Sequence, residues 1–371
     1  MQTDNKTKFI PLARPDIREE DILLVNEVLR SGMLVQGEFV KKLEESFATY
    51  HNVKHAIVVS NGTATLHLAL KVLGVGTGDE VIVPAFSYIA TANVVELVGA
   101  TPVFVDIEEN SFNIDVAKIE EKISKRTKAI IPVHEFGLAC DIESIVLIAA
   151  KHNILVIEDA ACALGATQNE RLVGTYGILG SFSLHPRKSI TSGEGGILLT
   201  NDDKIAQKLR QLRNHGIEME NGKMNFVEAG FNYRMTDFQA ALAWSQFQRL
   251  KQTLEYKNQL AEIYFSQIKN SKIKLPFRPG GRNHTWQTFH LLLNGLDQDT
   301  VINFLKENGI GTNYGAQCIP GQTFYQKKYS FNAQQAFPNA YHAYTKGLAI
   351  PMYEKLTTDD ALKISDLINQ L

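Results

Sequence analysis

The chain has 371 residues, of which 44% are hydrophobic, so it is long enough for a large buried core and for two domains. Lys and Arg total 38 against 40 for Asp and Glu, and the net charge of -2 gives no field that would gather nucleic acid or an anionic membrane surface. A small molecule is therefore the expected partner.

The cysteines and the N-terminus indicate the compartment. Only Cys140, Cys162 and Cys318 occur, without a CxxC pair, so we expect neither a disulfide framework nor a metal site. The opening MQTDNKTKFIPLARPD lacks the apolar run of a signal peptide, and no later stretch approaches the ~18 apolar residues of a membrane helix. The sequence predicts a cytoplasmic protein that does not enter membranes.

Short β-branched runs alternate with helical segments between residues 56 and 200, which predicts an α/β fold with a mostly parallel sheet. Apolar residues recur at helical spacing in the connecting segments Thr63 to Leu73 and Ile142 to His152. Seven strands are expected, at Ala56 to Ser60, Val81 to Pro84, Pro102 to Val105, Ala129 to Val133, Leu155 to Glu158, Ser181 to Leu184 and Gly196 to Thr200.

A long helical stretch from Thr236 to about Ile268 leads into a second region. That region contains a strand-like segment, Gln287 to Leu293, a helix near Asp299 to Asn308 and a final helix after Thr358. We therefore expect a large domain with an N-terminal arm over residues 1–245 and a smaller α+β domain over residues 246–371.

Three polar segments follow predicted strands. Ser60-Asn61-Gly62-Thr63-Ala64 opens a helix, where glycine permits close approach and the first amides point at an anion; a plain helix cap is the alternative. Asp159 ends an apolar strand at the edge where α/β sheets bind ligands, and an N-cap is again the alternative. Lys188 lies in a polar, glycine-flanked loop and is a candidate Schiff-base former, rather than a solvated surface lysine.

Six motifs, in order and spacing, resemble the DegT/DnrJ/EryC1/StrS sugar aminotransferases: GTATLHLAL, VPAFSYIATANVV, PVHEFG, EDAACALGA, SFSLHPRKSITSGEGG and GFNYRMTDFQAAL. The resemblance extends from about residue 10 to the C-terminus. It implies fold type I of the pyridoxal-5'-phosphate (PLP) enzymes and a homodimer.

The resemblance also implies roles for the polar segments. Lys188 corresponds to the lysine that carries the cofactor, and Asp159 to the partner of the pyridine nitrogen. The cofactor phosphate is expected at Gly62, Thr63, Ala64 and Ser183.

At further positions the residue has an alternative interpretation or departs from the family pattern. Tyr88 is expected to stack on the pyridine ring, and Asn232 to reach the phosphate in the opposite subunit, which would make the active site composite; packing and a loop position are the alternatives. Cys162 stands where the family commonly has Gln or His as a donor to the phenolic oxygen, and a thiol is a much weaker donor. No role follows for His185 or Glu194.

The expected reaction is transfer of the amino group from L-glutamate to a nucleotide-linked keto-deoxysugar, with C4 of a 4-keto-6-deoxyhexose favoured over C3. A sugar dehydratase would carry histidine at the position of Lys188, and an oxidoreductase would need a GxGxxG that we do not find. A non-catalytic PLP-binding regulator is a further alternative. The segments 286–290 and 311–317 are expected to line the sugar side, though packing explains them about as well.

Overall fold

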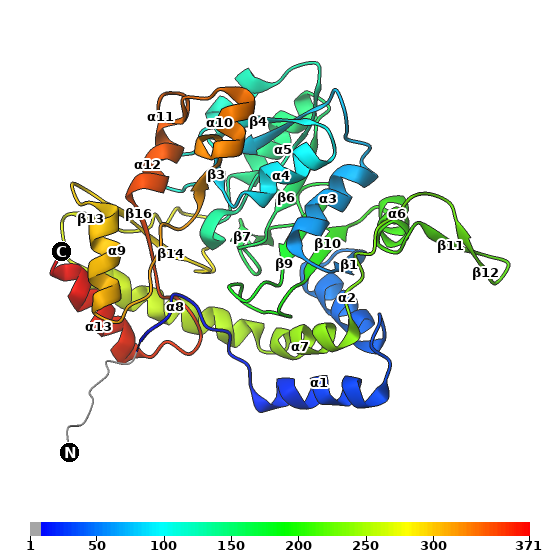
Figure 1. The fold of residues 1–371 in the computed structure, drawn as a ribbon, viewed down its shortest axis with the longest axis horizontal. Coiled ribbons are helices and arrows are strands. Elements are labelled where there is room, and N and C mark those ends of the chain that lie inside the picture. Colours follow the sequence, from blue (N-terminus) through cyan, green and yellow to red (C-terminus); the bar gives the residue numbers. More distant parts are fainter. Residues whose placement is uncertain (1–8) are drawn as a thin grey trace.

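A seven-stranded sheet forms the centre of the computed structural model, which describes residues 9–371 (Figure 1). The first eight residues of the expected N-terminal arm lie outside the described residues. The strand order is β1-β10-β9-β6-β5-β2-β4, and β10 alone runs antiparallel to its neighbours. The strands are β1 (His55–Val59), β2 (Glu80–Pro84), β4 (Thr101–Val105), β5 (Thr127–Ile130), β6 (Leu155–Asp159), β9 (Leu179–Ser183) and β10 (Gly196–Thr200).

The predicted α/β fold and its mostly parallel sheet are confirmed, and the strand bounds agree to within one residue except in two strands. The strand expected over Ala129 to Val133 ends at Ile130, because Pro132 has no N–H to donate to the ladder. The strand expected from Ser181 begins at Leu179 and includes Gly180, where a Cβ atom would lie 2.2 Å from the carbonyl oxygen of Gly174. That glycine permits close packing rather than a turn.

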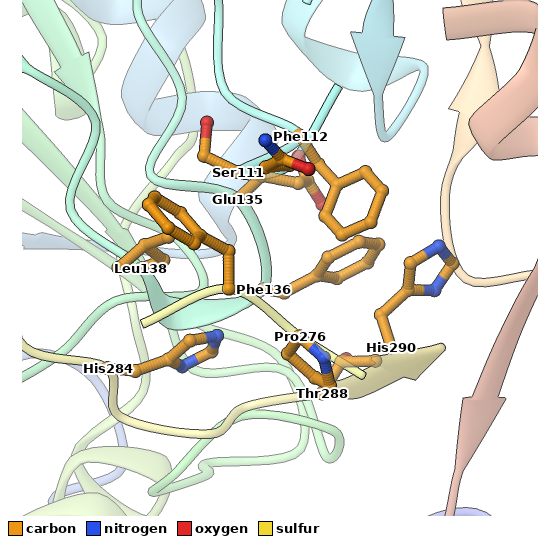
Figure 2. Close-up of a pocket in the computed structure, with 11 residues that line it drawn as sticks. Ser111, Phe112, Glu135, Phe136, Leu138, Pro276, His284, Thr288 and His290 are labelled. Atoms are coloured by element: carbon orange, nitrogen blue, oxygen red, sulfur yellow. The ribbon is translucent and has the colours of Figure 1, made fainter. Parts of the chain in front are cut away.

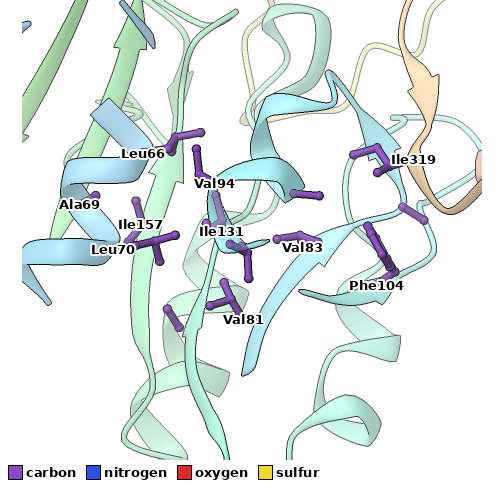
Figure 3. Close-up of a cluster of buried hydrophobic side chains, with 14 of the residues drawn as sticks. Leu66, Ala69, Leu70, Val81, Val83, Val94, Phe104, Ile131, Ile157 and Ile319 are labelled. Atoms are coloured by element: carbon purple, nitrogen blue, oxygen red, sulfur yellow. The ribbon is translucent and has the colours of Figure 1, made fainter. Parts of the chain in front are cut away.

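Both faces of the sheet are buried, and alternation along each strand sends successive side chains into opposite cores. Val81 and Val83 of β2 pack in one core, and Ile82 between them packs in another. Figure 3 shows the first of these cores, in which Leu70 of α3 lies beside Ile157 of β6. The helices of this part are α1 (Glu19–Ser31), α2 (Glu38–His51), α3 (Gly62–Val72), α4 (Ala90–Leu97), α5 (Ile142–Lys151), α6 (Asp203–Arg213) and α7 (Asp237–Phe247).

The long helix expected from Thr236 to Ile268 is two helices, α7 and α8 (Leu250–Gln267). Arg249 separates them with φ −111° and ψ 14°, outside the helical region. Its guanidinium donates to both carboxylate oxygens of Asp21 in α1, at 2.8 and 2.7 Å. The break thus coincides with the ion pair that fastens α1 along α7 (Figure 1).

The C-terminal region contains the expected strand and helices with small shifts in their bounds. Its separate core is formed by β14, α8, α9 and α13, whereas Ile319, Tyr325 and Ala340 join the core of the large sheet. The boundary between residues 245 and 246 stays a prediction. The elements are β13 (Ile273–Lys274), β14 (Phe289–Leu293), α9 (Gln298–Glu307), β15 (Gln317–Cys318), α10 (Thr323–Tyr329), α11 (Ala333–Ala336), α12 (Pro338–Lys346), β16 (Gly347–Ile350) and α13 (Thr358–Asn369).

Three short pairings complete the fold. β15 pairs with β3 (Phe86–Ser87), which joins the C-terminal region to the loop after β2. A hairpin of β11 (Ile217–Glu220) and β12 (Lys223–Phe226) projects from the body (Figure 1), and β7 (Thr167–Gln168) pairs with β8 (Arg171–Leu172). Within residues 9–371 we find no helix long and apolar enough to span a bilayer.

Replacement of Asp21 by Asn should lower the free energy of unfolding by about 3 kcal/mol, because the Arg249 charge loses its counter-ion in a buried place. Burial alone would raise the pKa of Asp21, but the hydrogen bonds from Arg249, Ser245 and Arg18 and the charge of Arg249 together outweigh it and lower that pKa. The contribution of the pair is therefore present at neutral pH and is lost as the pH falls through the lowered value.

Urea unfolding at pH 7 measures this loss. Glu255→Gln is the matched control, because its ion pair with Lys251 is exposed and is expected to contribute about 0–1 kcal/mol. Equal effects of the two substitutions would contradict the role given to the buried pair.

Candidate active site

A cavity of about 750 Å³ opens where the parallel strands end. Its walls are the segments that follow β1, β2, β5, β6 and β9, the edge at which open α/β sheets bind ligands. Eight of the nine predicted site residues line it: Gly62, Thr63, Ala64, Tyr88, Asp159, Cys162, Ser183 and Lys188. Residues that lie up to 126 positions apart in the sequence, Gly62 and Lys188 at the extremes, are thus brought together.

The first turn of α3 forms one end of the cavity. Gly62 is packed so closely on Ser183 that a Cβ atom would lie 2.8 Å from the Cβ of that serine, which explains the glycine without any unusual backbone angle. The N–H of Ala64 donates to the cap residue Asn61 at 2.8 Å. That bond leaves the amides of Gly62 and Thr63, together with the Ser183 hydroxyl, as the donors for an anion.

Two adjacent carboxylates at the end of β6 point to opposite sides of the sheet. Glu158 accepts from the N–H groups of Gly174, Tyr176 and Gly177 at 2.6–2.7 Å. It also lies 3.1 Å from Nε2 of His134, whose Nδ1 accepts from the backbone N–H of Cys140. Glu158 is therefore a structural residue that fixes the turn after β8.

Asp159 faces the cavity instead. Thr91 donates to its Oδ2 at 2.9 Å, and the N–H of Ala161 to its Oδ1 at 3.2 Å. Burial raises the pKa of Asp159, although these hydrogen bonds and the charge of Lys188 oppose the increase. The site therefore holds a carboxylate with little access to solvent, ready for a cationic partner.

Lys188 extends its amine across the cavity. Nζ lies 3.0 Å from Sγ of Cys162, a hydrogen-bond contact between the loop after β9 and the turn after β6. Burial raises the pKa of the Cys162 thiol, partly offset by the charge of Lys188. The thiol is thus a weak partner that leaves the amine available for chemistry.

Tyr88 has 66% of its surface exposed, so its ring has a free side toward the cavity. His185 and Glu194 also line the cavity, although their roles stay unassigned. Asn232 is exposed and does not line the cavity of its own chain.

The two C-terminal segments reach the cavity only in part, and their place on the sugar side stays a prediction. Gln287 and Thr288 of the first segment, and Gly315 and Ala316 of the second, reach the cavity. Trp286 belongs to the C-terminal core, where its ring stacks on His284 at 3.8 Å between centroids.

Sequence reasoning missed Glu135, which is 4% exposed and lines the same cavity. It also lines a small neighbouring cavity, shown in Figure 2, between Phe112, Phe136 and His290. The His290 ring packs on Phe136 at 4.4 Å between centroids, and burial lowers its pKa to about 3. The available signal was an acidic residue shortly after an apolar strand, in PVHEFG.

The chemistry of this donor set fits PLP. It combines amide and hydroxyl donors for a phosphate, an exposed aromatic ring for a flat heterocycle, a buried carboxylate for its nitrogen and an amine for its aldehyde. Among residues 9–371 no group of three or more His, Cys, Asp or Glu side chains is arranged to hold a metal ion.

Comparisons with known proteins agree with this chemistry. The model of the DegT/DnrJ/EryC1/StrS aminotransferase family matches residues 15–369. The chain is 36% identical to the spore coat polysaccharide biosynthesis protein SpsC of Bacillus subtilis, over 99% of this chain and 98% of that one. It is 45% identical to the GDP-perosamine synthase of Caulobacter vibrioides, over 74% of this chain and 75% of that one.

The fold is shared with solved structures as well. The PLP form of the putative sugar aminotransferase Spr1654 from Streptococcus pneumoniae has a TM-score of 0.93 at 29% identity, over 98% of each chain. DesV of S. venezuelae, in complex with a ketimine intermediate, has a TM-score of 0.91 at 30% identity, also over 98% of each chain. The chain belongs to the DegT/DnrJ/EryC1/StrS aminotransferase family and is a PLP-dependent enzyme.

Proposed function

We propose that this enzyme transfers the amino group of L-glutamate to C4 of a nucleotide-linked 4-keto-6-deoxyhexose. The observation that carries the proposal is the position of Lys188, whose amine reaches into a large cavity that also contains the buried carboxylate of Asp159. The name of GDP-perosamine synthase denotes a nucleotide-linked sugar product for that relative, which supports the substrate class.

The residues that would hold PLP are those that meet in the cavity. Lys188 would bind it covalently, Asp159 would face its ring nitrogen, and Tyr88 would cover its ring. The Gly62 and Thr63 amides and the Ser183 hydroxyl would bind its phosphate; Ala64, also expected there, could donate only if Asn61 released its N–H. When bound, PLP supplies the carbonyl that takes up the amino group and the electron-withdrawing ring that the proton transfers require.

Lys188 has a second task as a proton carrier. A neutral Nζ would take the proton from the carbon that gives up the amino group and return one to the carbon that receives it, as a general base and then a general acid. Arginine could not replace it, because a guanidinium stays protonated. Cys162 beside Nζ provides a weak hydrogen-bond partner that does not compete for this proton.

Asp159 keeps the positive charge on the ring nitrogen by its own negative charge. The donors Thr91 and Ala161 fix both carboxylate oxygens, so the charge is positioned before any ligand arrives. The cost of burying that charge in the ligand-free chain is the reason that its pKa is raised.

We also propose a homodimer with composite active sites. Asn232 is exposed and absent from the cavity of its own chain, as a residue that serves the other subunit would be. The β11–β12 hairpin exposes Met219, Met224 and Phe226 by 62–66%, an apolar surface suited to a second copy of the chain. The three cysteines are free thiols, which supports a place in the reducing cytoplasm.

Two rival functions make different demands on the site. A sugar dehydratase of this family would carry histidine at the position of Lys188. A PLP-binding regulator would need the phosphate site but no proton carrier beside Asp159, so the arrangement of Lys188 favours turnover.

Loaded wild-type enzyme should release 2-oxoglutarate from L-glutamate and lose its visible absorption band as the amino group is taken up. Lys188→Ala should slow this half-reaction by about 1000-fold or more, because the proton carrier is gone. Stopped-flow absorbance and 2-oxoglutarate assay provide the measurement, with Lys251→Ala on the exposed face of α8 as control. A loaded wild-type protein that releases no 2-oxoglutarate would favour the regulator.

Asp159→Asn should slow the same half-reaction by about 100-fold or more, since the ring nitrogen loses its charge partner. The same change should raise Tm of the cofactor-free protein at pH 7 by about 2 °C. Because burial raises the pKa of Asp159, its stabilising protonated form is lost as the pH rises, and Asn carries no such penalty. Calorimetry at pH 5 and pH 8 should show the gain growing with pH; a gain independent of pH would contradict the buried-charge explanation.

Incubation with L-glutamate and separate 4-keto and 3-keto nucleotide sugars should give a new C–N bond at C4 only. The nucleotide supplies binding energy away from the reacting carbonyl and orients it. NMR of the products locates the bond. Amination of the 3-keto substrate alone would exclude the C4 assignment, and inactivity on both would exclude this substrate pair.

A further inference from the structure

Two buried carboxyl groups reach the same cavity, but their surroundings differ. Asp159 is 5% exposed and receives hydrogen bonds at both oxygens. Glu135 is 4% exposed, and its Oε2 has no hydrogen-bond partner within residues 9–371. A carboxylate in that condition would be costly, whereas a neutral carboxylic acid is tolerated.

A chain of two hydroxyl groups connects these carboxyls. Thr91 Oγ1 lies 3.2 Å from Ser87 Oγ and donates its proton to Asp159. Ser87 in turn lies within hydrogen-bonding reach of Glu135. All four side chains are at least nine-tenths buried, so water does not compete for these bonds.

Each hydroxyl group has a single proton, and this limits the direction of the hydrogen bonds between Glu135 and Asp159. Since Thr91 spends its only hydroxyl proton on Asp159, it must accept from Ser87. Ser87 then has no proton left for Glu135 and must accept from it. The reverse order, with the proton on Asp159, would satisfy the hydroxyl groups equally, but the Ala161 N–H donates to Asp159 in either case and Oε2 of Glu135 has no partner within residues 9–371, so the shared proton belongs on Glu135.

The local electrostatics agree with this placement. Burial raises the pKa of Glu135 to about 8; the charge of Lys188 opposes this increase and that of Asp159 adds to it. Asp159 has two fixed donors and Glu135 has few, so the pair shares its proton unequally in favour of Glu135.

We propose that Glu135 is a positioning residue that keeps its proton and, through Ser87 and Thr91, orients the hydrogen bond that holds Asp159 as a carboxylate. Its importance for catalysis rests on the proposed function, but the proton on Glu135 does not. Loss of that proton turns the Ser87 hydroxyl toward Glu135, deprives Thr91 of its donor and places a second negative charge beside Asp159.

The two histidines beside Glu135 stay neutral between pH 6 and 8.5. Burial lowers the pKa of His290 and of His284, which also lines the small cavity, to about 3 in each case, and raises that of the Cys162 thiol. Lys188 and Asp159 are the charged neighbours. His134 points away, toward Glu158. The comparison of wild type with Glu135→Gln therefore decides whether a transition near pH 8 belongs to Glu135.

Infrared spectroscopy of the cofactor-free protein tests the proton itself. The difference spectrum between wild type and Glu135→Gln at pH 6.5 should contain the carbonyl band of one protonated carboxylic acid, and the band should disappear as the pH rises through about 8. Absence of that band at pH 6.5 would overturn the proposal, whether or not the enzyme aminates a sugar.

Measurements on the PLP-loaded enzyme test the coupling through the Ser87 and Thr91 hydroxyl groups. Its absorption spectrum should change near pH 8, and kcat/KM for L-glutamate should fall at least fivefold between pH 7 and 9. Glu135→Gln keeps a neutral donor to Ser87, so it should stay within twofold of wild type at pH 7 and lose less than twofold by pH 9. Retention of the wild-type pH dependence in this variant would contradict the assignment to Glu135.

Ser87→Ala interrupts the chain while it leaves Glu135 in place. It should keep the infrared band but reduce the spectral change near pH 8 to less than half. Phe112→Leu, in the wall of the small cavity beside Glu135, is the packing control and should keep both signals (Figure 2). A full spectral change in Ser87→Ala would show that the hydroxyl chain carries no coupling.

Discussion

The site depends on how the end of β6 is held. Glu158 accepts three backbone N–H groups and contacts His134, and this fixes the last residues of the strand between β5 and β9. Because strand residues alternate in direction, the neighbouring Asp159 must then project into the cavity. The structural carboxylate of Glu158 thus positions the carboxylate of Asp159. The cavity residues from the other strands are arranged around Asp159.

The same arrangement explains why the cavity is poised for a charged ligand. The ligand-free protein places the buried Asp159 and Glu135 and the half-buried Lys188 around one cavity, with few donors for Glu135. The stability lost there is supplied elsewhere, by the large double-faced core and by pairs such as Asp21 with Arg249. A cofactor that carries a phosphate and a protonated ring nitrogen neutralises part of this imbalance, so cofactor binding is expected to stabilise the fold.

Much of the fold could be predicted because the strands are short apolar runs flanked by polar residues, and periodicity identifies the helices between them. Cavity residues such as Lys188 could be predicted because they lie at or beyond the ends of strands, in motifs that resemble those of a known family. The break at Arg249 could not, since its cause is an ion pair with Asp21, 228 residues away. The roles of Glu135, Ser87 and Thr91 could not be predicted for the same reason. They depend on how these side chains are placed relative to Asp159 in the folded chain, which the local sequence does not encode.

The central claim is that Lys188 carries PLP in this cavity. Sodium borohydride makes the bond between the cofactor and its lysine permanent, so peptide mapping by mass spectrometry of the reduced enzyme identifies that lysine directly. The structure predicts one modified peptide, which contains Lys188, and no modification in Lys188→Ala. A cofactor adduct on any other lysine, or wild-type protein that remains unmodified after reduction, would contradict the account.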